Sequence, residues 1–222
     1  MGKNVVINTI PENDKYRVEA LARYRILDTP PEQSFDNIAK LATQLFDVPI
    51  SLITFVDTAH VFLKSHVGLD GTQTTAPRSS SLCSLALLTD EVTIFDNIPK
   101  MDPCLLADPV LLSEMGFQFY AGAPLITPDG FRIGTLCVMG MNPRSFSERD
   151  ARLLTCLSRI AMDEIEMRLK TIVETECNEL KQQEANDILK KANEELEAAN
   201  KEIQATFDEL ARSHEQLKKK LG

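Results

Sequence analysis

Residues 117–140 read FQFYAGAPLITPDGFRIGTLCVMG, and this stretch decides the fold. At its middle lies Thr127-Pro128-Asp129-Gly130, in which proline presets φ for a turn and Asp-Gly tolerates the positive φ of a tight reversal. Apolar residues occupy alternate positions on each side of this turn. Because successive side chains of a strand point to opposite faces, the pattern predicts two antiparallel inner strands of a sheet that is covered on both sides.

The chain before this hairpin carries further helix and strand patterns. Apolar spacing of i, i+3, i+4 and i+7 predicts a helix that starts at Pro31 and is broken at Asp47, and a rougher stripe predicts an earlier helix capped by Asn13 or Asp14. Apolar runs predict strands at Ile50–Val56, Val61–Val67 and Val92–Phe95, and a short helix at Leu82–Leu88. The expected fold class is α+β, with a central antiparallel sheet of about six strands flanked by helices.

Two segments interrupt these elements. Gly71–Ser81 is rich in Thr and Ser and contains Pro77, so we expect a mobile loop. Asp96–Gly116 is expected to be a mostly irregular connection with one or two helical turns.

From Ser147 onward the sequence predicts one long helix. Ser147-Glu148-Arg149-Asp150 is typical of a capped helix start with acidic residues in the first turn. No proline follows Pro143, and no glycine lies between Gly140 and Gly222. A helix of this length would extend about 110 Å at about 1.5 Å per residue.

The second half of this helix carries a heptad repeat. Its apolar residues are Leu189, Leu196, Ile203, Leu210 and Leu217. Two registers are open. If these residues are d positions, the a positions are Asn193, Asn200, Phe207, His214 and Leu221, which favours parallel two-stranded pairing. If they are a positions, the d positions are Ala192, Ala199, Thr206 and Ser213.

A stripe of this kind on an isolated helix would bury too little to offset the cost of ordering it. We therefore predict a parallel homodimer through the C-terminal helix, rather than a single solvated helix. The expected interface is Leu189, Asn193, Leu196, Asn200, Ile203, Phe207, Leu210 and Leu217. The heptad does not extend back through Leu180, so the packing phase is expected to shift there.

Composition excludes several kinds of partner. The net charge is −9, and no basic stripe is present that could neutralise phosphates, so nucleic acid is not expected. No apolar run approaches the ~20 residues that span a bilayer, so no membrane partner is expected. The five cysteines are irregularly spaced, which fits a reduced cytoplasm rather than a disulfide framework.

With these elements placed, residues 16–170 resemble the GAF family of sensory domains, in particular bacterial modules attached to histidine kinases and diguanylate cyclases. The most specific matching stretch is Phe119–Leu125 (FYAGAPL) followed by Gly130 and by Gly134–Val138 (GTLCV). Further matches are Arg23–Pro31 with Phe35 and Asp36, Val48–Ile53, Phe62–Ser65 before Gly68-Leu69, Arg78–Cys83, Asp102-Pro103 and Asp108-Pro109.

The resemblance implies helices from both chain ends on one face of the sheet and a ligand pocket under loops on the other. It also implies the domain order: a flexible leader over residues 1–12, a GAF sensory domain over 13–170 and a coiled-coil signalling helix over 171–222. The implied function is a cytoplasmic regulatory module, not an enzyme, that binds a small ligand or a partner. It would signal through the coiled coil to an output domain outside this chain, such as a histidine kinase or diguanylate cyclase.

Departures from the family's subgroups leave the cofactor undetermined. Leu85 stands where some members have a His two places after the Cys, and Cys104 replaces an Arg of the connection. The Cys-His dipeptide of bilin-binding members and the complete Asn-Lys-Phe-Asp-Glu set of cyclic-nucleotide-binding members are absent. His60, His66 and Asp57 are too few for a metal site.

Cys83 and Cys137 are the first candidates for chemistry. Cys83 opens a short predicted helix, where the helix dipole can lower a thiol pKa, and Cys137 lies on the central strand. Together they could form a redox pair or an attachment point, or they could be small buried hydrophobes. The rival functions are therefore a GAF-fold redox enzyme acting on free methionine sulfoxide, a thiol sensor, and a dimerisation module without a ligand.

The other candidate pocket residues are polar groups and glycines. Arg78, with Ser81 nearby, could hold a carboxylate or phosphate of a ligand, or Arg78 could pair with Asp96 and fix the loop. Tyr120 suits a pocket or a core. Gly122, like Gly134, could let a ligand or a backbone approach, or could mark a bulge or tight packing. Ser213-His214-Glu215 lacks the following Pro of a phosphoacceptor box, so phosphotransfer is not expected.

Overall fold

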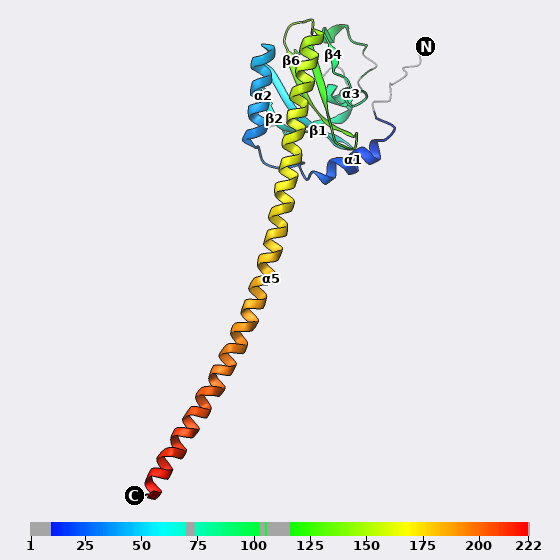
Figure 1. The fold of residues 1–222 in the computed structure, drawn as a ribbon. Coiled ribbons are helices and arrows are strands. Elements are labelled where there is room, and N and C mark those ends of the chain that lie inside the picture. Colours follow the sequence, from blue (N-terminus) through cyan, green and yellow to red (C-terminus); the bar gives the residue numbers. More distant parts are fainter. Residues whose placement is uncertain (1–9, 70–73, 103–104, 106–115, 222) are drawn as a thin grey trace. The chain divides into compact units, whose positions relative to one another are not determined.

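The computed structural model describes residues 10–69, 74–102, 105 and 116–221. Six strands form one antiparallel sheet in the order β3-β2-β1-β6-β5-β4 (Figure 1). Helices cover the sheet on both faces, so the α+β architecture expected from the sequence is confirmed. The strands are β1 Ile50–Val56, β2 His60–Val67, β3 Thr75–Pro77, β4 Thr93–Phe95, β5 Phe119–Ile126 and β6 Arg132–Gly140.

The predicted hairpin forms the middle of this sheet. β5 pairs with β6 over its whole length, and β6 pairs on its other side with β1. At the turn, Gly130 takes φ +86°, and Thr127 accepts from its amide and donates its own amide to Phe131. The Thr127 side chain donates to Asp129 at 2.7 Å and accepts from the Phe131 amide at 2.9 Å. Turn chemistry that is local to the five residues 127–131 therefore fixes the register of the central strands.

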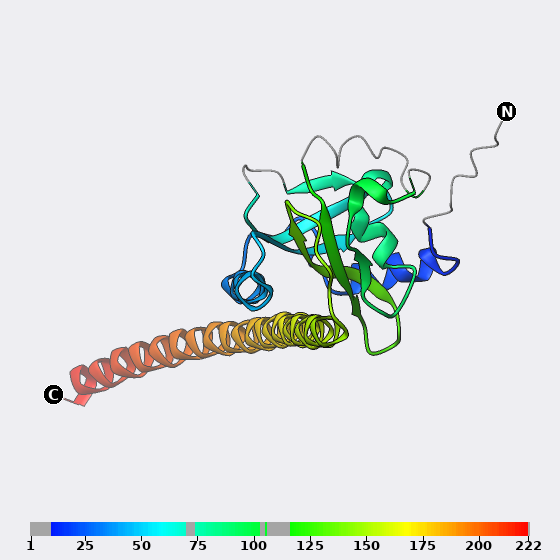
Figure 2. The same cartoon turned by 90° about the horizontal axis from the view of Figure 1, so that it is seen from above.

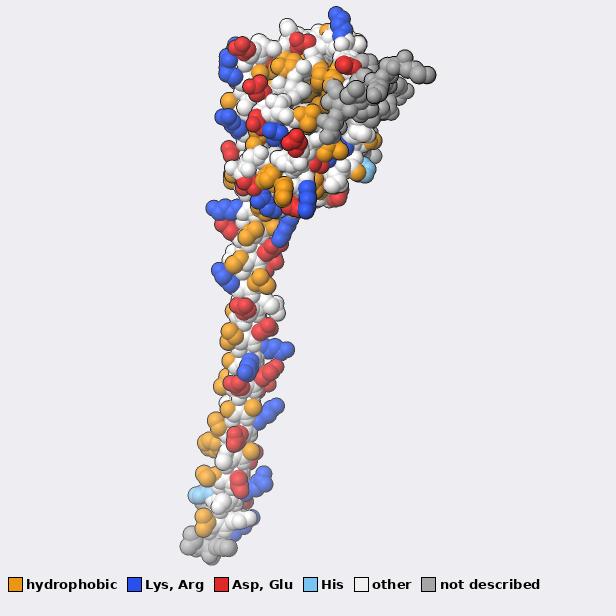
Figure 3. Space-filling model, turned by 90° about the vertical axis from the view of Figure 1, so that its right-hand side faces the viewer, with side chains coloured by type: hydrophobic (Ala, Val, Ile, Leu, Met, Phe, Trp, Pro, Cys, Tyr) orange, Lys and Arg blue, Asp and Glu red, His pale blue; other side chains and the backbone are white. Residues whose placement is uncertain are grey.

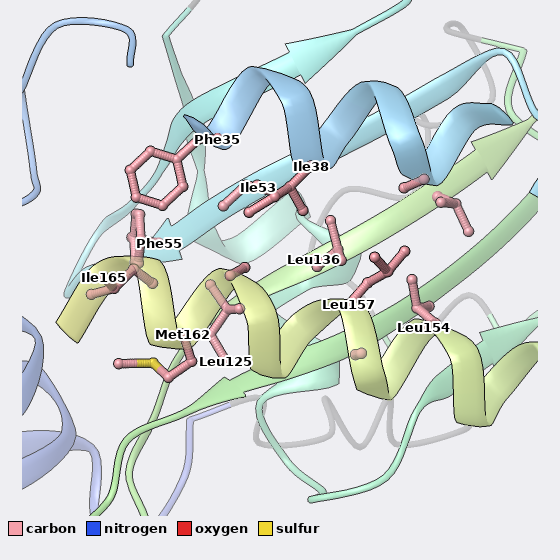
Figure 4. Packing of buried hydrophobic residues seen from close by; sticks show 14 of the residues in the cluster. Phe35, Ile38, Ile53, Phe55, Leu125, Leu136, Leu154, Leu157, Met162 and Ile165 are labelled. Atoms are coloured by element: carbon pink, nitrogen blue, oxygen red, sulfur yellow. The ribbon is translucent and has the colours of Figure 1, made fainter. Parts of the chain in front are cut away.

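One face of the sheet packs against two helices. These are α2, Gln33–Phe46, and the first part of α5, which runs Glu148–Leu221. Figure 2 shows both on the same side of the sheet, and Figure 4 shows Leu154, Leu157, Met162 and Ile165 of α5 pointing at side chains of α2 and the strands. This core includes Phe35, Phe55, Leu125 and Leu136, all without measurable exposure. The helical face is therefore a closed apolar core.

The opposite face carries a smaller cluster under the short helix α3, Leu82–Ala86. Its members come from β1, β2, β5, β6 and α3. Helix α1, Asp14–Arg23, packs against β6, but its buried Ala20 and Leu21 belong to the core of the helical face. Ser81 caps α3 by accepting from the Cys83 amide at 3.2 Å.

The structure corrects several expected boundaries. The segment Gly71–Ser81 is not a simple loop: Thr75–Pro77 pair with β2 as strand β3, and Arg78–Ser80 form a 3-10 helix, η1. Edge pairing with β2 supplies backbone partners that a composition argument cannot see. Helix α2 begins at Gln33 rather than Pro31. By contrast, the helical turn expected in the connection after Asp96 is present as the 3-10 helix η2, Ile98–Lys100.

Some expectations fall on residues outside the described ranges. They are the first nine residues of the expected leader, residues 71–73 of the expected loop, and Pro103, Cys104 and Asp108-Pro109 of the connection.

The long C-terminal helix is present as predicted from the absence of breakers. Its start carries a reciprocal cap, in which the Asp150 amide donates to Ser147 Oγ at 3.1 Å and the Ser147 amide donates to Asp150 Oδ2 at 3.2 Å. The chain divides into two compact units, Met1–Leu169 and Lys170–Gly222. Among the helices of the described ranges, none combines the length and the apolar character needed to cross a bilayer.

Candidate functional site

A cavity of about 140 Å³ lies on the face of the sheet opposite α2 and α5. Its floor is formed by side chains of β1, β2, β5 and β6, and its wall by the segment from Thr75 to Cys83. The lining is predominantly apolar. It consists of Leu52, Thr54, Val61, Leu63, Leu69, Thr75, Ala76, Pro77, Ser80, Ser81, Leu82, Cys83, Phe117, Tyr120 and Met139.

Three of the seven pocket residues expected from the sequence line this cavity: Ser81, Cys83 and Tyr120. The other four, Arg78, Asp96, Gly122 and Cys137, do not line it. The apolar residues that make most of its surface were not singled out in the sequence, because an apolar residue in a strand looks the same whether it faces a core or a cavity.

Arg78 holds a carboxylate, but not the one expected. Its Nη1 and Nη2 donate to the two carboxylate oxygens of Asp14 at 2.8 and 2.7 Å, and Nη1 also donates to the Asp57 carbonyl at 3.0 Å. Asp96 is exposed and engages through its backbone carbonyl, which accepts from the Arg144 amide. The alternative in which Arg78 pairs with Asp96 is therefore wrong. Arg78 instead ties the segment that forms the cavity wall to α1.

Asp14 is shared between two guanidinium groups. Arg17 Nε donates to its Oδ1 at 2.7 Å, and Arg17 is 1% exposed. Burial pushes the pKa of Asp14 upward, but the hydrogen bonds and charges of Arg78 and Arg17 outweigh burial and hold that pKa below its usual value. Asp14 therefore stays ionised at neutral pH between its two cations.

Tyr120 and Gly122 are explained by one contact. A side chain on Gly122 would place its Cβ 2.2 Å from the Tyr120 hydroxyl, so Gly122 leaves the space through which the tyrosine ring lies. The Tyr120 hydroxyl is buried, and among the described residues it has no hydrogen-bond partner. Gly134 has a different reason: its Cβ would lie 2.0 Å from the Thr54 carbonyl oxygen, which is tight backbone packing. The Tyr120 hydroxyl, which has no hydrogen-bond partner among the described residues, thus belongs to a residue that lines the cavity.

Cys83 and Cys137 come together in the structure. Their Sγ atoms lie 3.9 Å apart, one from α3 and one from β6, and both thiols are buried. The contact with Cys137 and the nearby hydroxyls of Thr135, Thr54 and Ser81 lower the pKa of Cys83 to about 6, against the opposing effect of burial. The pKa of Cys137 is raised well above its usual value, chiefly by its contact with Cys83 and by burial. The pair has one thiol poised to ionise and one held protonated.

A buried lysine on β2 was missed in the sequence. The Lys64 side chain is fully buried and donates to Thr29 Oγ1, to the Pro30 carbonyl and to Glu32 Oε1 at 2.6–2.7 Å. Glu32 Oε1 also accepts from Arg168 Nε of α5 at 2.8 Å. We call Lys64, Glu32 and Arg168 the polar clamp. The available signal was a lysine directly after the apolar run Val61–Leu63 of a predicted strand.

A β-bulge places Lys64. Ile53 pairs with Ser65 and Thr54 with Leu63, which leaves Lys64 as the extra residue. Its neighbours on the strand, Val61 and Leu63, line the cavity. Strand β2 therefore lines the cavity with Val61 and Leu63, and its Lys64 is connected to α5 through Glu32.

A second contact reaches the same turn of α5 from α1. The Tyr24 hydroxyl, directly after α1, donates to Glu166 Oε1 at 2.5 Å, and Arg168 Nη1 donates to the Tyr24 carbonyl at 3.1 Å. Burial, with the neighbouring Glu166, raises the pKa of Tyr24 and keeps the hydroxyl a donor. Helix α1 thus contacts the cavity wall through Asp14 and α5 through Tyr24.

Within residues 170–222, the apolar heptad residues are exposed to solvent. Leu189, Leu196, Ile203, Phe207, Leu210 and Leu217 are each 56–71% exposed. Figure 3 shows hydrophobic side chains along one side of the C-terminal part of α5. Among the described residues, no group of three or more His, Cys, Asp or Glu is arranged to hold a metal ion.

Comparisons with known proteins agree with this fold. A protein-family model described as the GAF domain matches residues 30–165, more than half of the chain. A cyclic di-GMP phosphodiesterase of Pseudomonas aeruginosa is 33% identical over 156 residues, which cover 70% of this chain and 26% of that protein. The chain thus spans about a quarter of the length of this curated relative.

Two solved structures share the fold. A free methionine-R-sulfoxide reductase from Neisseria meningitidis, in complex with its substrate, is similar with a TM-score of 0.52 and 18% identity, covering 73% of this chain and 96% of that one. The GAF domain of an Acinetobacter phosphoenolpyruvate-protein phosphotransferase is similar with a TM-score of 0.51 and 17% identity, covering 71% and 95%. At these identities the likeness shows the fold alone.

Proposed function

The chain belongs to the GAF domain family, and from that premise we propose that it is a cytoplasmic sensory module. It binds a small, largely apolar ligand in the cavity and transmits binding through α5 to a parallel coiled coil. The output domain lies outside this chain. The observation that carries the proposal is the polar clamp, because it connects a strand that lines the cavity to the segment of α5 at the end of the first unit.

The size and lining of the cavity define the ligand class. An apolar cavity of about 150 Å³ accommodates a molecule of the size of benzene. The cavity here has a similar volume and offers the hydroxyls of Ser81, Thr54 and Tyr120 among apolar side chains. We therefore propose a neutral ligand of roughly that size with one polar group, rather than a charged nucleotide.

Transmission follows from the alternation along β2. A ligand that displaces Val61 or Leu63 moves the bulge at Lys64, and Lys64 holds Glu32, which holds Arg168. Displacement of the cavity wall moves Arg78 and, through Asp14, helix α1. Both routes end on residues 166–168 of α5. A ligand biases α5 only if it binds its two positions with different affinity.

The coiled coil supplies a two-state output. Leu at d and Asn at a favour a parallel pair, and the phase break between Leu180 and Leu189 allows two registers of similar energy. The output domain is proposed to be a signalling enzyme, such as a histidine kinase or diguanylate cyclase. The Pseudomonas relative adds a cyclic di-GMP phosphodiesterase as a third candidate.

Native mass spectrometry of the freshly purified chain tests ligand binding. We expect a dimer carrying a small adduct that Ala76→Leu, which fills the cavity, removes. The matched control is Ala22→Leu at an exposed position of α1, which keeps the adduct. A dimer of bare chain mass would contradict ligand binding and favour a dimerisation module.

Sedimentation tests the coiled coil. We expect Leu196→Asn with Leu210→Asn to convert a micromolar dimer to monomer, because two apolar layers of the seam are lost. The control pair, Glu194→Asn with Asp208→Asn, lies off the stripe and should leave the dimer intact. A wild-type monomer at micromolar concentration would end the transmission proposal.

A catalytic role is the second candidate, favoured by the contact between Cys83 and Cys137 at the cavity wall. An assay with free methionine sulfoxide and a dithiol reductant distinguishes the two roles. Turnover by the wild type that is lost in Cys83→Ser would make the chain an enzyme. Absence of turnover supports the regulatory role.

A further inference from the structure

The sulfur atoms of two buried cysteines, Cys83 and Cys137, lie close enough for a small movement to bring them to disulfide distance. Cys83 Sγ and Cys137 Sγ are 3.9 Å apart, and a disulfide needs about 2.05 Å. The two residues lie 54 positions apart in the chain, on α3 and on β6, so their meeting is a product of the tertiary fold. A shift of about 2 Å in the short helix α3 would bring the sulfurs to bonding distance.

The surroundings of the pair favour reaction at one sulfur. Cys83 lines the cavity, whereas Cys137 lies behind it with no measurable exposure. The contact with Cys137 and the nearby hydroxyls of Thr135, Thr54 and Ser81 lower the pKa of Cys83, which favours the thiolate, the nucleophilic form of cysteine. The Tyr120 hydroxyl, buried at the same cavity and without a partner among the described residues, is a donor available to an oxygen atom placed there.

We propose that Cys83 and Cys137 are a reversible redox site, in which a small hydroperoxide entering the cavity oxidises Cys83 and Cys137 resolves the product as a disulfide. The cavity volume of about 140 Å³ restricts the oxidant to a small molecule. The inference goes beyond ligand sensing, because it requires a covalent step and no resident ligand.

The chemistry balances with the oxidant as co-substrate. The Cys83 thiolate attacks the outer oxygen of ROOH, so that an S–O bond forms and the O–O bond breaks. The alcohol ROH leaves with the proton that the thiol lost, the peroxide is reduced, and Cys83 becomes a sulfenic acid. The Cys137 sulfur then attacks Cys83, an S–S bond forms, and hydroxide leaves with the Cys137 proton as water. The sum is two thiols and ROOH giving a disulfide, ROH and water. A small dithiol then reduces the disulfide to the two thiols by exchange and is itself oxidised to a disulfide.

The test uses the full chain with the three other cysteines replaced, Cys104→Ser, Cys156→Ser and Cys177→Ser. One equivalent of hydrogen peroxide is added, and intact mass and peptide mapping are recorded. We expect the mass to fall by two hydrogen atoms and a Cys83–Cys137 linked peptide to appear. With Cys137→Ser, we expect a sulfenic acid on Cys83 that a dimedone probe traps. A bulky probe, cumene hydroperoxide, should react at least tenfold more slowly.

Three results would overturn the proposal. The first is that both thiols stay unmodified in the native protein. The second is that Cys83→Ser leaves the rate of Cys137 oxidation unchanged. The third is that the disulfide forms only after denaturant is added. If Cys83→Ser does not fold, the test instead measures the alkylation rate of Cys83 in the chain that keeps only Cys83 and Cys137. The proposal then requires that Cys83 is alkylated in the native state. Ligand binding is tested separately by the native-mass adduct of the freshly purified protein, and oxidation is measured on protein from which that adduct has been removed.

The pH profile of the reaction gives a second readout. With a Cys83 pKa of about 6, the thiolate fraction and hence the rate rise about tenfold between pH 5 and 7 and then level off. A thiol of ordinary pKa would instead keep gaining about tenfold per pH unit up to pH 8. A rate that still climbs above pH 7.5 contradicts the assigned nucleophile.

Discussion

The two faces of the sheet share their strands but are closed in different ways. On the helical face, α2 and α5 bury a continuous set of large apolar side chains. On the other face, a five-residue helix and a three-residue strand enclose a cavity of about 140 Å³ together with two thiols and a hydroxyl without a described partner. The first arrangement is typical of structural cores, and the second of sites where a ligand or a reaction replaces packing.

Both faces are nevertheless stabilised by the same kind of ion-pair arrangement. One carboxylate is shared by two cations: Asp14 by Arg17 and Arg78 on the side of the cavity wall, and Glu32 by Lys64 and Arg168 on the helical side. The carboxylates belong to α1 and to the start of α2, while Arg168 belongs to α5. The difference between the faces therefore lies in what fills them, and not in how they are held.

Truncation of matched leucines should give the largest effect and should separate the two faces. Leu136→Ala removes a side chain from the closed core and should lower the free energy of unfolding by about 3–4 kcal/mol. Leu52→Ala, on the neighbouring strand but at the cavity, should lower it by about 1–2 kcal/mol because part of its surface already has no packing partner. Urea unfolding measures both.

Equal losses for the two leucines would mean that the cavity face is as tightly packed as the helical one. In that case the comparison, and the ligand site with it, would fail. A larger loss at Leu52 than at Leu136 would have the same consequence.

The hairpin and the helices were predictable because their signals are local. Thr127–Gly130 form the turn from their own side chains and backbone, and Ser147 with Asp150 caps α5 within one turn. Strand β3 was not predictable, because Thr75–Pro77 are a strand only through pairing with β2. Local chemistry therefore decides the first group of elements and tertiary pairing the second.

The candidate site was predictable only in part, for a related reason. The cysteines were identified by type, but only the fold brings them to 3.9 Å. Arg78 was recognised as a charge that needs a partner, yet several carboxylates were available and Asp14, 64 residues away, is the one the fold presents. The cavity itself is a property of how α3 and β3 cover the sheet, which no residue pattern records.

Removing the buried ammonium of the polar clamp should have an intermediate effect. Lys64→Met leaves the Pro30 carbonyl without this donor and removes one of the two cations that hold Glu32, so it should lower the free energy of unfolding by about 2 kcal/mol. Because Arg168 still holds Glu32, the helical face should stay assembled. Lys100→Met, an exposed lysine of η2, should stay within about 0.5 kcal/mol of the wild type.

The same variant sharpens the transmission proposal. If β2 reports cavity occupancy to α5 through Lys64, then Lys64→Met should keep the ligand adduct in native mass spectrometry while hydrogen exchange near Arg168 no longer responds to ligand removal. An unchanged response at Arg168 would assign transmission to the α1 route instead.

The smallest expected effect is on the stability of the domain at low pH, where the contributions of the two shared carboxylates can be compared directly. The pKa values of Asp14 and Glu32 are both held below their usual values: burial opposes this in each case, but the hydrogen bonds and charges of the paired cations outweigh it. A carboxylate with a lowered folded-state pKa stabilises the fold above its unfolded-state pKa, and this stability is lost as pH falls through the folded-state pKa. Both contributions should therefore be complete at pH 6 and fade below about pH 4.

Asp14→Asn and Glu32→Gln should each reduce, by about 1 kcal/mol or less, the loss of unfolding free energy that the wild type shows as the pH falls from 6 to below 4. The control is Asp163→Asn, at an exposed position of α5. Asp14→Asn should in addition change the cavity face alone, seen as faster oxidation of Cys83, because the wall held by Arg78 is released. Glu32→Gln should leave that rate unchanged. If instead both variants speed the oxidation equally, the two faces open together, and the cavity is not an independently held part of the domain.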